Sequence, residues 1–153
     1  MSAPGTRHTY SIKEAAALTG LPASTLRYYE SIGVISPIGR GASSKHRVYT
    51  EEDLDLLTWV SCLSATGMSV ADMRRYLANG RLGPAAAPEQ IALLEAQQER
   101  LEAEARAVVL RSRYVGVKIE YWQAIQAGDQ SRAERLSDEA RALADDLKKS
   151  GRG

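Results

Sequence analysis

Hydrophobic and polar positions over the first third of the chain predict two short helices with clear ends. Ser11 and Glu14 can form a capping box, in which each side chain reaches the other residue's backbone amide, and Gly20 suits a left-handed helix stop. A second helix begins after Pro22 and runs to Gly33. Two short helices with so brief a connection are typical of a helix-turn-helix.

The segment that follows reads as extended chain around a flexible tip. Residues 34–37 and 45–49 are predicted as two short arms, and the Gly/Ser-rich residues 39–44 separate them. We therefore expect a small β-ribbon, or wing, beside the helix-turn-helix.

Two more capping patterns predict the third and fourth helices. Thr50 with Asp53 begins one, and Ser69 with Asp72 begins the other, which ends near Gly80. These elements give a DNA-binding type of domain over residues 10–79, preceded by a flexible tail over 1–9. The Gly/Pro-rich residues 80–87 are predicted to be a linker.

Apolar side chains recur every seven residues beyond this linker and predict one long helix over residues 88–127. One row of the repeat is apolar throughout, which is typical of a coiled coil. Such a helix spans roughly 55 Å, and its narrow apolar stripe needs a partner helix. We expect the partner to be the same helix in a second chain, giving a homodimer. The predicted dimerisation residues are Ile91, Leu94, Leu101, Val108, Val115, Ile119 and Trp122.

The chain after this helix is short. Gly128 breaks the pattern, and residues 128–149 are predicted to form a C-terminal helix that packs on the coiled coil, followed by a tail over 150–153. The expected fold is thus mainly α: a winged helix-turn-helix head, a long dimerisation helix and a short C-terminal helix.

Charge and cysteine content sharpen this picture. The net charge is +1 over 153 residues, yet residues 1–50 carry six Lys/Arg against two Glu, which suggests an anion-binding face. The single Cys62 allows no internal disulfide, so a reducing, cytoplasmic compartment is expected. No apolar run reaches membrane-spanning length, so no membrane partner is expected.

Basic, hydroxyl and aromatic side chains gather on the second helix and the wing. Hydroxyls and guanidinium groups suit base edges and phosphates in a DNA groove, although one tyrosine of the adjacent pair could equally belong to the core. The candidate DNA-binding residues are Ser11, Ser24, Thr25, Arg27, Tyr28, Tyr29, Arg40, Lys45, His46, Arg47 and Tyr49.

No pattern of catalytic residues accompanies these features. The sequence has no supported Ser/His/Asp set and no phosphate-binding glycine loop, so we expect no enzyme activity and no cofactor. With one Cys and two His, a soft-metal site is not expected either. An effector-independent or architectural DNA-binding protein, and a coiled-coil module that binds only protein, remain alternatives.

The head resembles the MerR family of bacterial transcription regulators. The resemblance covers residues 10 to about 77 and rests on these motifs: YSIKEAA at 10–16, LTGL at 18–21, STLRYYE at 24–30, GVISP at 33–37, RVY at 47–49 and GMSV at 67–70. It implies a dimer with antiparallel long helices that binds an inverted repeat in an overlong promoter spacer. Such a dimer distorts the DNA so that RNA polymerase can engage both promoter elements.

The resemblance also bears on individual residues. It places Ser24, Thr25, Arg27, Tyr28, Arg47 and Tyr49 at positions where relatives contact DNA. In the wing, relatives commonly carry Asn-Gly-aromatic before the arginine, whereas residues 44–46 here are Ser-Lys-His, in a loop about one residue longer.

The effector is left open by the sequence. Metal-sensing relatives carry cysteines near the ends of the long helix, and none is present there; drug-sensing relatives carry a large C-terminal domain, for which too few residues remain. Cys62 resembles a cysteine of the aldehyde- and nitrosative-stress branch, so it is either a thiol sensor or a small buried residue. Trp59, Tyr114 and Tyr121, with Trp122, either line a pocket for a small-molecule effector or pack in the core and dimer seam.

Overall fold

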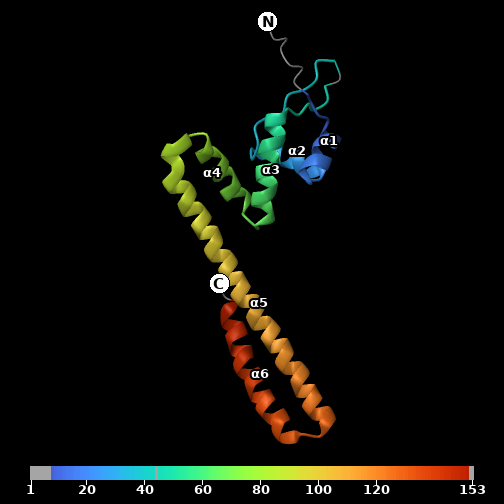
Figure 1. The fold of residues 1–153 in the computed structure, drawn as a ribbon, viewed down its shortest axis with the longest axis vertical. Coiled ribbons are helices and arrows are strands. Elements are labelled where there is room, and N and C mark those ends of the chain that lie inside the picture. The colour runs from blue at the N-terminus through green and yellow to red at the C-terminus, as the bar shows by residue number, and fades with distance from the viewer. Residues whose placement is uncertain (1–7, 44, 152–153) are drawn as a thin grey trace. The chain divides into compact units, whose positions relative to one another are not determined.

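Helices make up most of this structure, a computed structural model that describes residues 8–43 and 45–151. The elements are α1 (Ile12–Thr19), α2 (Ala23–Ser31), α3 (Glu51–Ala65), α4 (Val70–Gly80), the 3-10 helix η1 (Gly83–Ala86), α5 (Ala87–Ala127) and α6 (Gln130–Ser150). They form two units, Met1–Glu95 and Ala96–Gly153, and the boundary falls inside α5 (Figure 1). The mainly helical fold with a winged head is as predicted.

Helix ends in the head follow the predicted caps. Ser11 and Glu14 form the capping box of α1, and Thr50 and Asp53 form that of α3. Gly20 ends α1 with a left-handed φ of 73°, a conformation that costs glycine little. The starts of α1 and α3 are thus fixed by local hydrogen bonds that the sequence encodes within four residues, whereas α2 begins after Pro22 without a side-chain cap.

The wing differs from the prediction in which residues pair. Arg40 pairs with Arg47 in an antiparallel bridge, and the Val48 amide donates to the Gly39 carbonyl at 2.8 Å. Residues 34–37 form no bridge, and Val34 and Ile35 are buried in the core. The prediction of an extended arm at 34–37 is therefore wrong, and the ribbon begins at about residue 39.

The segment before α1 is hydrogen-bonded to the end of the wing. Tyr10 and Tyr49 form a second antiparallel bridge, with amide–carbonyl distances of 2.9 and 2.8 Å in the two directions. The predicted tail over 1–9 falls outside the described residues except for His8 and Thr9, and the end of the predicted tail over 150–153 does so as well. The His8 ring lies edge-on to the Tyr10 ring at 4.6 Å.

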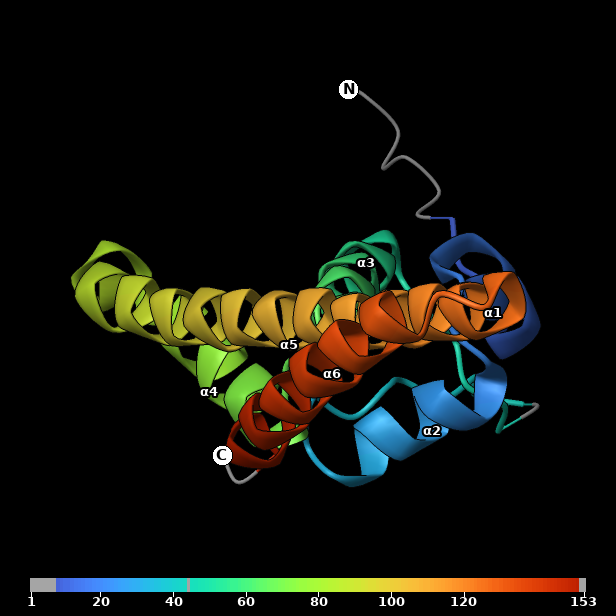
Figure 2. The ribbon, with the colours of Figure 1, turned by 90° about the horizontal axis from the view of Figure 1, so that it is seen from below.

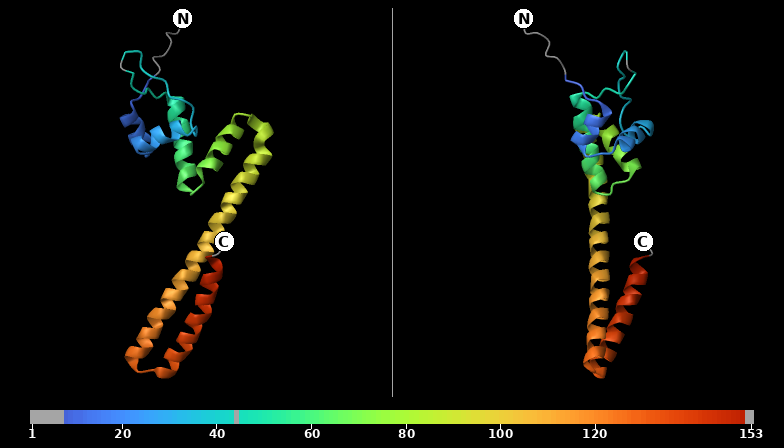
Figure 3. Two further views of the ribbon diagram at one scale, coloured as in Figure 1. Left: turned by 180° about the vertical axis from the view of Figure 1, so that it is seen from behind. Right: turned by 90° about the vertical axis from the view of Figure 1, so that its right-hand side faces the viewer.

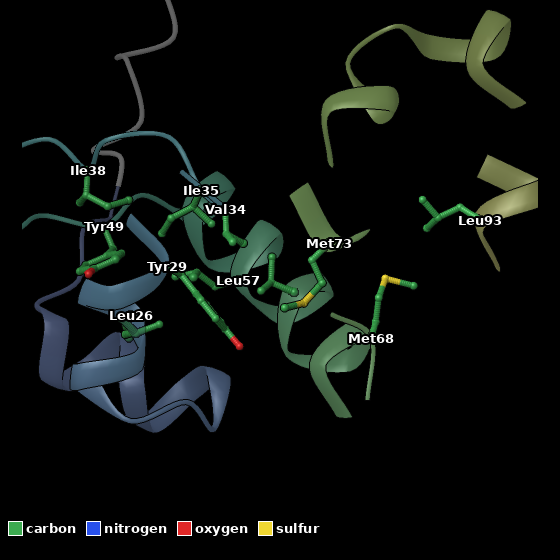
Figure 4. Close-up of a cluster of buried hydrophobic side chains, with 12 residues drawn as sticks. Leu26, Tyr29, Val34, Ile35, Ile38, Tyr49, Leu57, Met68, Met73 and Leu93 are labelled. Atoms are coloured by element: carbon green, nitrogen blue, oxygen red, sulfur yellow. The ribbon is translucent and has the colours of Figure 1, made fainter. Parts of the chain in front are cut away.

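A single apolar cluster holds α1, α2, α3, α4 and the base of the wing together. Its largest fully buried side chains include Tyr49, Leu26, Leu57 and Met73 (Figure 4). Leu93, from the first part of α5, also belongs to this cluster. Burying such side chains stabilises a domain by about 1.5–3 kcal/mol each before the entropy cost of folding is counted.

The segment between α4 and α5 is structured rather than a loose linker. Residues 83–86 form η1, and Ala86 is buried. The Gln90 side chain donates to the Tyr76 carbonyl at 2.8 Å and accepts from the Asn79 side chain at 3.2 Å. These two hydrogen bonds tie the start of α5 to α4.

The second unit is a helical hairpin. Gly128 (φ 73°) ends α5, and α6 runs back along it, as Figures 2 and 3 show from two directions. The hairpin core consists of Val117 and Ala124 from α5 with Ala133, Leu136, Ala140 and Leu143 from α6. Because α6 covers only one side of α5, apolar side chains on the other side of α5, such as Val108 and Val115, stay exposed.

Candidate nucleic-acid interface

Helix α2 presents one polar face to solvent. Ser24, Arg27 and Tyr28 are exposed and Thr25 is half-buried, while Leu26 and Tyr29 are buried beneath them. The helical repeat of 3.6 residues produces this division, since residues three or four apart share a face. The exposed face therefore combines a cation, hydroxyls and an aromatic ring, as groove contacts require.

The two adjacent tyrosines of α2 have different surroundings. Tyr28 is 53% exposed, whereas Tyr29 is 6% exposed and its hydroxyl donates to Ser64 Oγ at 3.2 Å. Figure 4 shows Tyr29 reaching from α2 towards α3. The prediction that Tyr29 contacts DNA is therefore wrong: its ring belongs to the core and joins α2 to α3.

Glu30 links α2 to the wing. Its two carboxylate oxygens accept from Arg47 Nε at 2.8 Å and from the Ile38 amide at 3.2 Å. Burial alone would raise the pKa of this carboxyl, but the hydrogen bonds from Arg47 and Ile38 outweigh burial and leave the pKa lowered. Sequence reasoning did not assign Glu30 a role, although its place in the Leu-Arg-Tyr-Tyr-Glu motif was the available signal.

Arg47 therefore has a structural role, because it holds the wing against α2, besides carrying a charge that a ligand could bind. Its ion pair with Glu30 leaves the two side chains only 22% and 13% exposed. A guanidinium held by a partly buried carboxylate is fixed in orientation, and its remaining N–H groups stay available.

The tip of the wing carries exposed polar and basic side chains. Arg40 Nη1 donates to the Lys45 carbonyl at 3.2 Å, and Lys45 and His46 are exposed. Lys45 has a left-handed φ of 57°, which is uncommon for a residue with a side chain. Glycine adopts that conformation freely, so a lysine there carries a small conformational cost.

Tyr49 is not on the surface. It is fully buried, and its hydroxyl has no hydrogen-bond partner among the described residues. Burial raises the pKa of this phenol. The prediction that Tyr49 contacts DNA is wrong, because its side chain is buried in the apolar cluster of the head.

Ser11 lies at the edge of this surface. It is exposed, but its hydroxyl already accepts from the Glu14 amide at 3.2 Å as part of the cap. Its contact with DNA stays a prediction, while its structural role in the cap is directly visible.

The effector candidates fall in different parts of the chain. Cys62 is exposed, so the interpretation as a small buried residue is wrong for this structure. Trp59 is 62% exposed on α3 in the first unit. Tyr114 and Tyr121 instead pack against the hairpin core of the second unit, with Lys118 Nζ 5.7 and 6.0 Å from their ring centroids. The four aromatic side chains thus do not form one cluster within either unit.

The predicted dimerisation residues share a solvent-exposed stripe on α5. Leu101 is 38% exposed and Trp122 is 65% exposed, and the remaining members lie between these values: Ile91, Leu94, Val108, Val115 and Ile119. A shallow apolar groove runs along Val115, Ile119 and Trp122. So long an apolar surface is unusual for a lone helix in water.

Neither a membrane-spanning helix nor a metal-binding cluster is found among the residues that the structure describes. No helix there is long and apolar enough to cross a membrane. No group of three or more His, Cys, Asp or Glu side chains there is arranged to hold a metal ion.

The head fold and its basic surface define a winged helix-turn-helix protein. Residues 10–80 match the family described as "MerR HTH family regulatory protein". An uncharacterized HTH-type transcriptional regulator from Haemophilus influenzae is 32% identical over 96 residues, which cover 63% of this chain and 70% of the relative. The chain therefore belongs to the MerR family of helix-turn-helix regulators.

Two further relatives show how far the similarity extends. The uncharacterized HTH-type regulator YyaN of Bacillus subtilis is 41% identical over 71 residues, 46% of this chain and 51% of that protein. The crystal structure of HiNmlR, "a MerR family regulator lacking the sensor domain, bound to promoter DNA", is 27% identical with a TM-score of 0.64. It covers 84% of this chain and 96% of the other, so the fold likeness reaches beyond the head.

Proposed function

We propose that this protein is a dimeric transcription regulator that binds an inverted repeat in a promoter and distorts the DNA between the half-sites. In this proposal the head (residues 10–79) reads DNA, residues 88–127 pair two chains, and residues 128–149 brace that helix. Acting on promoter DNA, it works beside RNA polymerase at the nucleoid in the cytoplasm. The observation that carries the proposal is the exposed face of α2 next to a basic wing within one unit.

The α2 face supports direct contact with a groove. Arg27 makes no ion pair among the described residues, and Ser24 beside it is exposed. An arginine on a short exposed helix can bind guanine through two hydrogen bonds or bind phosphate through its charge. Tyr28 can pack its ring on sugar and donate its hydroxyl to a phosphate.

The wing supports a second contact on the neighbouring backbone. Lys45 has a left-handed backbone (φ 57°), at the position where the family resemblance implies a common glycine. A residue held in a sparsely populated conformation suggests a functional constraint, here a cation at the wing tip. Arg40 and His46 lie in the same ribbon and widen the basic surface.

The exposed stripe of α5 supports the dimer. Its apolar side chains repeat every seven residues, and α6 covers a different side of the helix. A second copy of α5 would bury the stripe by knobs-into-holes packing. Two-fold symmetry then matches an inverted repeat, and HiNmlR, which shares the fold, was crystallised with promoter DNA.

Arg27→Ala tests the DNA-reading face. If Arg27 contacts a base, its loss should weaken binding to the operator by about 1–3 kcal/mol and relax specificity at one position. Arg135→Ala is the matched control, since it removes the same charge from the exposed surface of α6, outside the head. Titration of labelled operator DNA measures both. Equal losses in the two variants would remove α2 from the interface.

A thiol sensor at Cys62 is a second candidate for how the regulator responds. The supporting observation is that Cys62 is exposed on α3, the helix that packs against α1 in the head. Induction by electrophiles should then fail in Cys62→Ser while operator binding persists. Unchanged induction in that variant would show that Cys62 is not the sensor. Such a result would favour the alternative of an effector-independent DNA-binding protein.

A further inference from the structure

A hollow on the head lies between α3, α4 and the start of α5. Its volume is about 570 Å³, and all of its lining residues belong to the first unit. This volume falls within the range of small-molecule sites in proteins. The α2 face and the wing do not line it, so it is separate from the proposed DNA surface.

The lining combines aromatic and apolar side chains with two carboxylates. The apolar part consists of Leu56, Trp59, Tyr76 and Leu77, and the acidic part of Glu52 and Asp55. Glu52, Asp55 and Trp59 lie three or four residues apart in sequence on α3, so they share one helical face.

The carboxylates are available to a ligand. Neither Glu52 nor Asp55 pairs with a cation or a hydrogen-bond donor among the described residues. The one cation in the lining, Arg81, donates from Nη2 to Ser36 Oγ at 3.1 Å. The Gln90 side chain is already hydrogen-bonded to the Tyr76 carbonyl and to the Asn79 side chain. The carboxylates of Glu52 and Asp55 are therefore the side chains of the hollow that have no partner among the described residues, and they outnumber its one cation.

The aromatic groups favour the same kind of ligand. Trp59 is 62% exposed, and tryptophan is the side chain that attracts a cation most strongly over its ring face. Anionic oxygens and an indole ring together complement a positive charge carried on an apolar body. A metal ion would instead need several converging oxygen or nitrogen ligands, which the hollow does not bring together.

We propose that this hollow binds a small organic cation with an aromatic or aliphatic body, such as a quaternary ammonium compound. The ligand would touch α3 and α4 together with Gln90 in the first turn of α5. If the proposed function holds, it would thereby join the DNA-reading head to the start of the dimerisation helix, and would be an effector.

Calorimetric titration of the full chain without DNA tests the site. Benzyltrimethylammonium is the probe, and benzenesulfonate is the control ligand with a similar ring and the opposite charge. We expect heat of binding with the cation alone. The Glu52→Gln/Asp55→Asn double variant should weaken binding about tenfold, and added salt should weaken it in the wild type. Trp59→Leu should also weaken it, at an exposed position that leaves the core intact.

The matched control removes two charges elsewhere in the same unit. Glu51→Gln/Glu89→Gln changes exposed carboxylates that do not line the hollow, and it should bind the cation like the wild type. Equal weakening in the two double variants, equal binding of benzenesulfonate, or no heat with the cation would overturn the proposal. Arg27→Ala should bind the cation normally, so a failure of the DNA-binding proposal stays distinguishable from a failure of this one.

Discussion

At the scale of single residues, the head uses its tyrosines and charges for different purposes. Tyr28 faces solvent and Tyr29 faces α3, because adjacent helical residues point about 100° apart. Glu30 accepts one hydrogen bond from Ile38 and one from Arg47, through its two carboxylate oxygens. Within residues 26–30, Leu26, Tyr29 and Glu30 thus stabilise the fold, whereas Arg27 and Tyr28 lie on the surface.

Tyr49→Phe tests the assignment of Tyr49 to the core. Its buried hydroxyl has no partner among the described residues, so removing it should leave stability unchanged or raise it by up to roughly 1 kcal/mol. Operator binding should be unaffected. Urea unfolding with a DNA titration measures both, and a clear loss in operator affinity would return Tyr49 to the interface.

Glu30→Gln tests the link between α2 and the wing. The folded-state pKa of Glu30 lies below its ordinary range, so the ionised carboxylate stabilises the fold at neutral pH. That contribution is complete above the unfolded-state pKa and is lost as the pH falls through the folded-state pKa.

The variant should therefore cost about 2 kcal/mol at neutral pH and progressively less on acidification. Glu134→Gln, an exposed carboxylate on α6, is the control and should show a small effect at both pH values. Unfolding followed at neutral and acidic pH gives the comparison. A cost for Glu30→Gln that does not shrink on acidification would contradict the assigned ion pair.

At the scale of elements, the sequence predicts helix starts well because caps are local. Three cap side chains each accept a hydrogen bond from the backbone amide three residues later: Ser11, Thr50 and Ser69. Both partners of each bond therefore lie within four consecutive residues of the sequence. The wing was harder, because burial of Val34 and Ile35 depends on packing against distant helices. The hollow near Trp59 was not predictable, since α3, α4 and α5 form it only after folding.

Val108→Asp tests α5 as a dimerisation element. Val108 is 56% exposed in the single chain, so the charge should leave the folded subunit intact. Buried against a second copy of α5, an unpaired carboxylate would cost several kcal/mol and dissociate the dimer. Ala142→Asp, at an exposed position of α6, is the control and should stay dimeric. Sizing by light scattering decides; a dimer that survives Val108→Asp would make the heptad assignment wrong.

At the scale of the complete chain, the features described above fall into two units, each of which contains part of α5. The first unit contains the basic surface and the hollow, and the second contains the hairpin that braces α5. No described residue of either unit covers the exposed stripe of α5, and we therefore propose that a second chain covers it. Membership in the MerR family agrees with this division, and the fold likeness to HiNmlR extends over 84% of the chain.

The most direct test of a DNA-distorting dimer is a footprint of the purified protein on the promoter region upstream of its own gene, with and without RNA polymerase. A DNA-distorting dimer should protect an inverted repeat inside an overlong promoter spacer, with hypersensitive bases at its centre. Diffuse protection that modest salt removes would indicate phosphate binding without sequence readout. That result would contradict the regulator proposed here and favour an architectural DNA-binding protein.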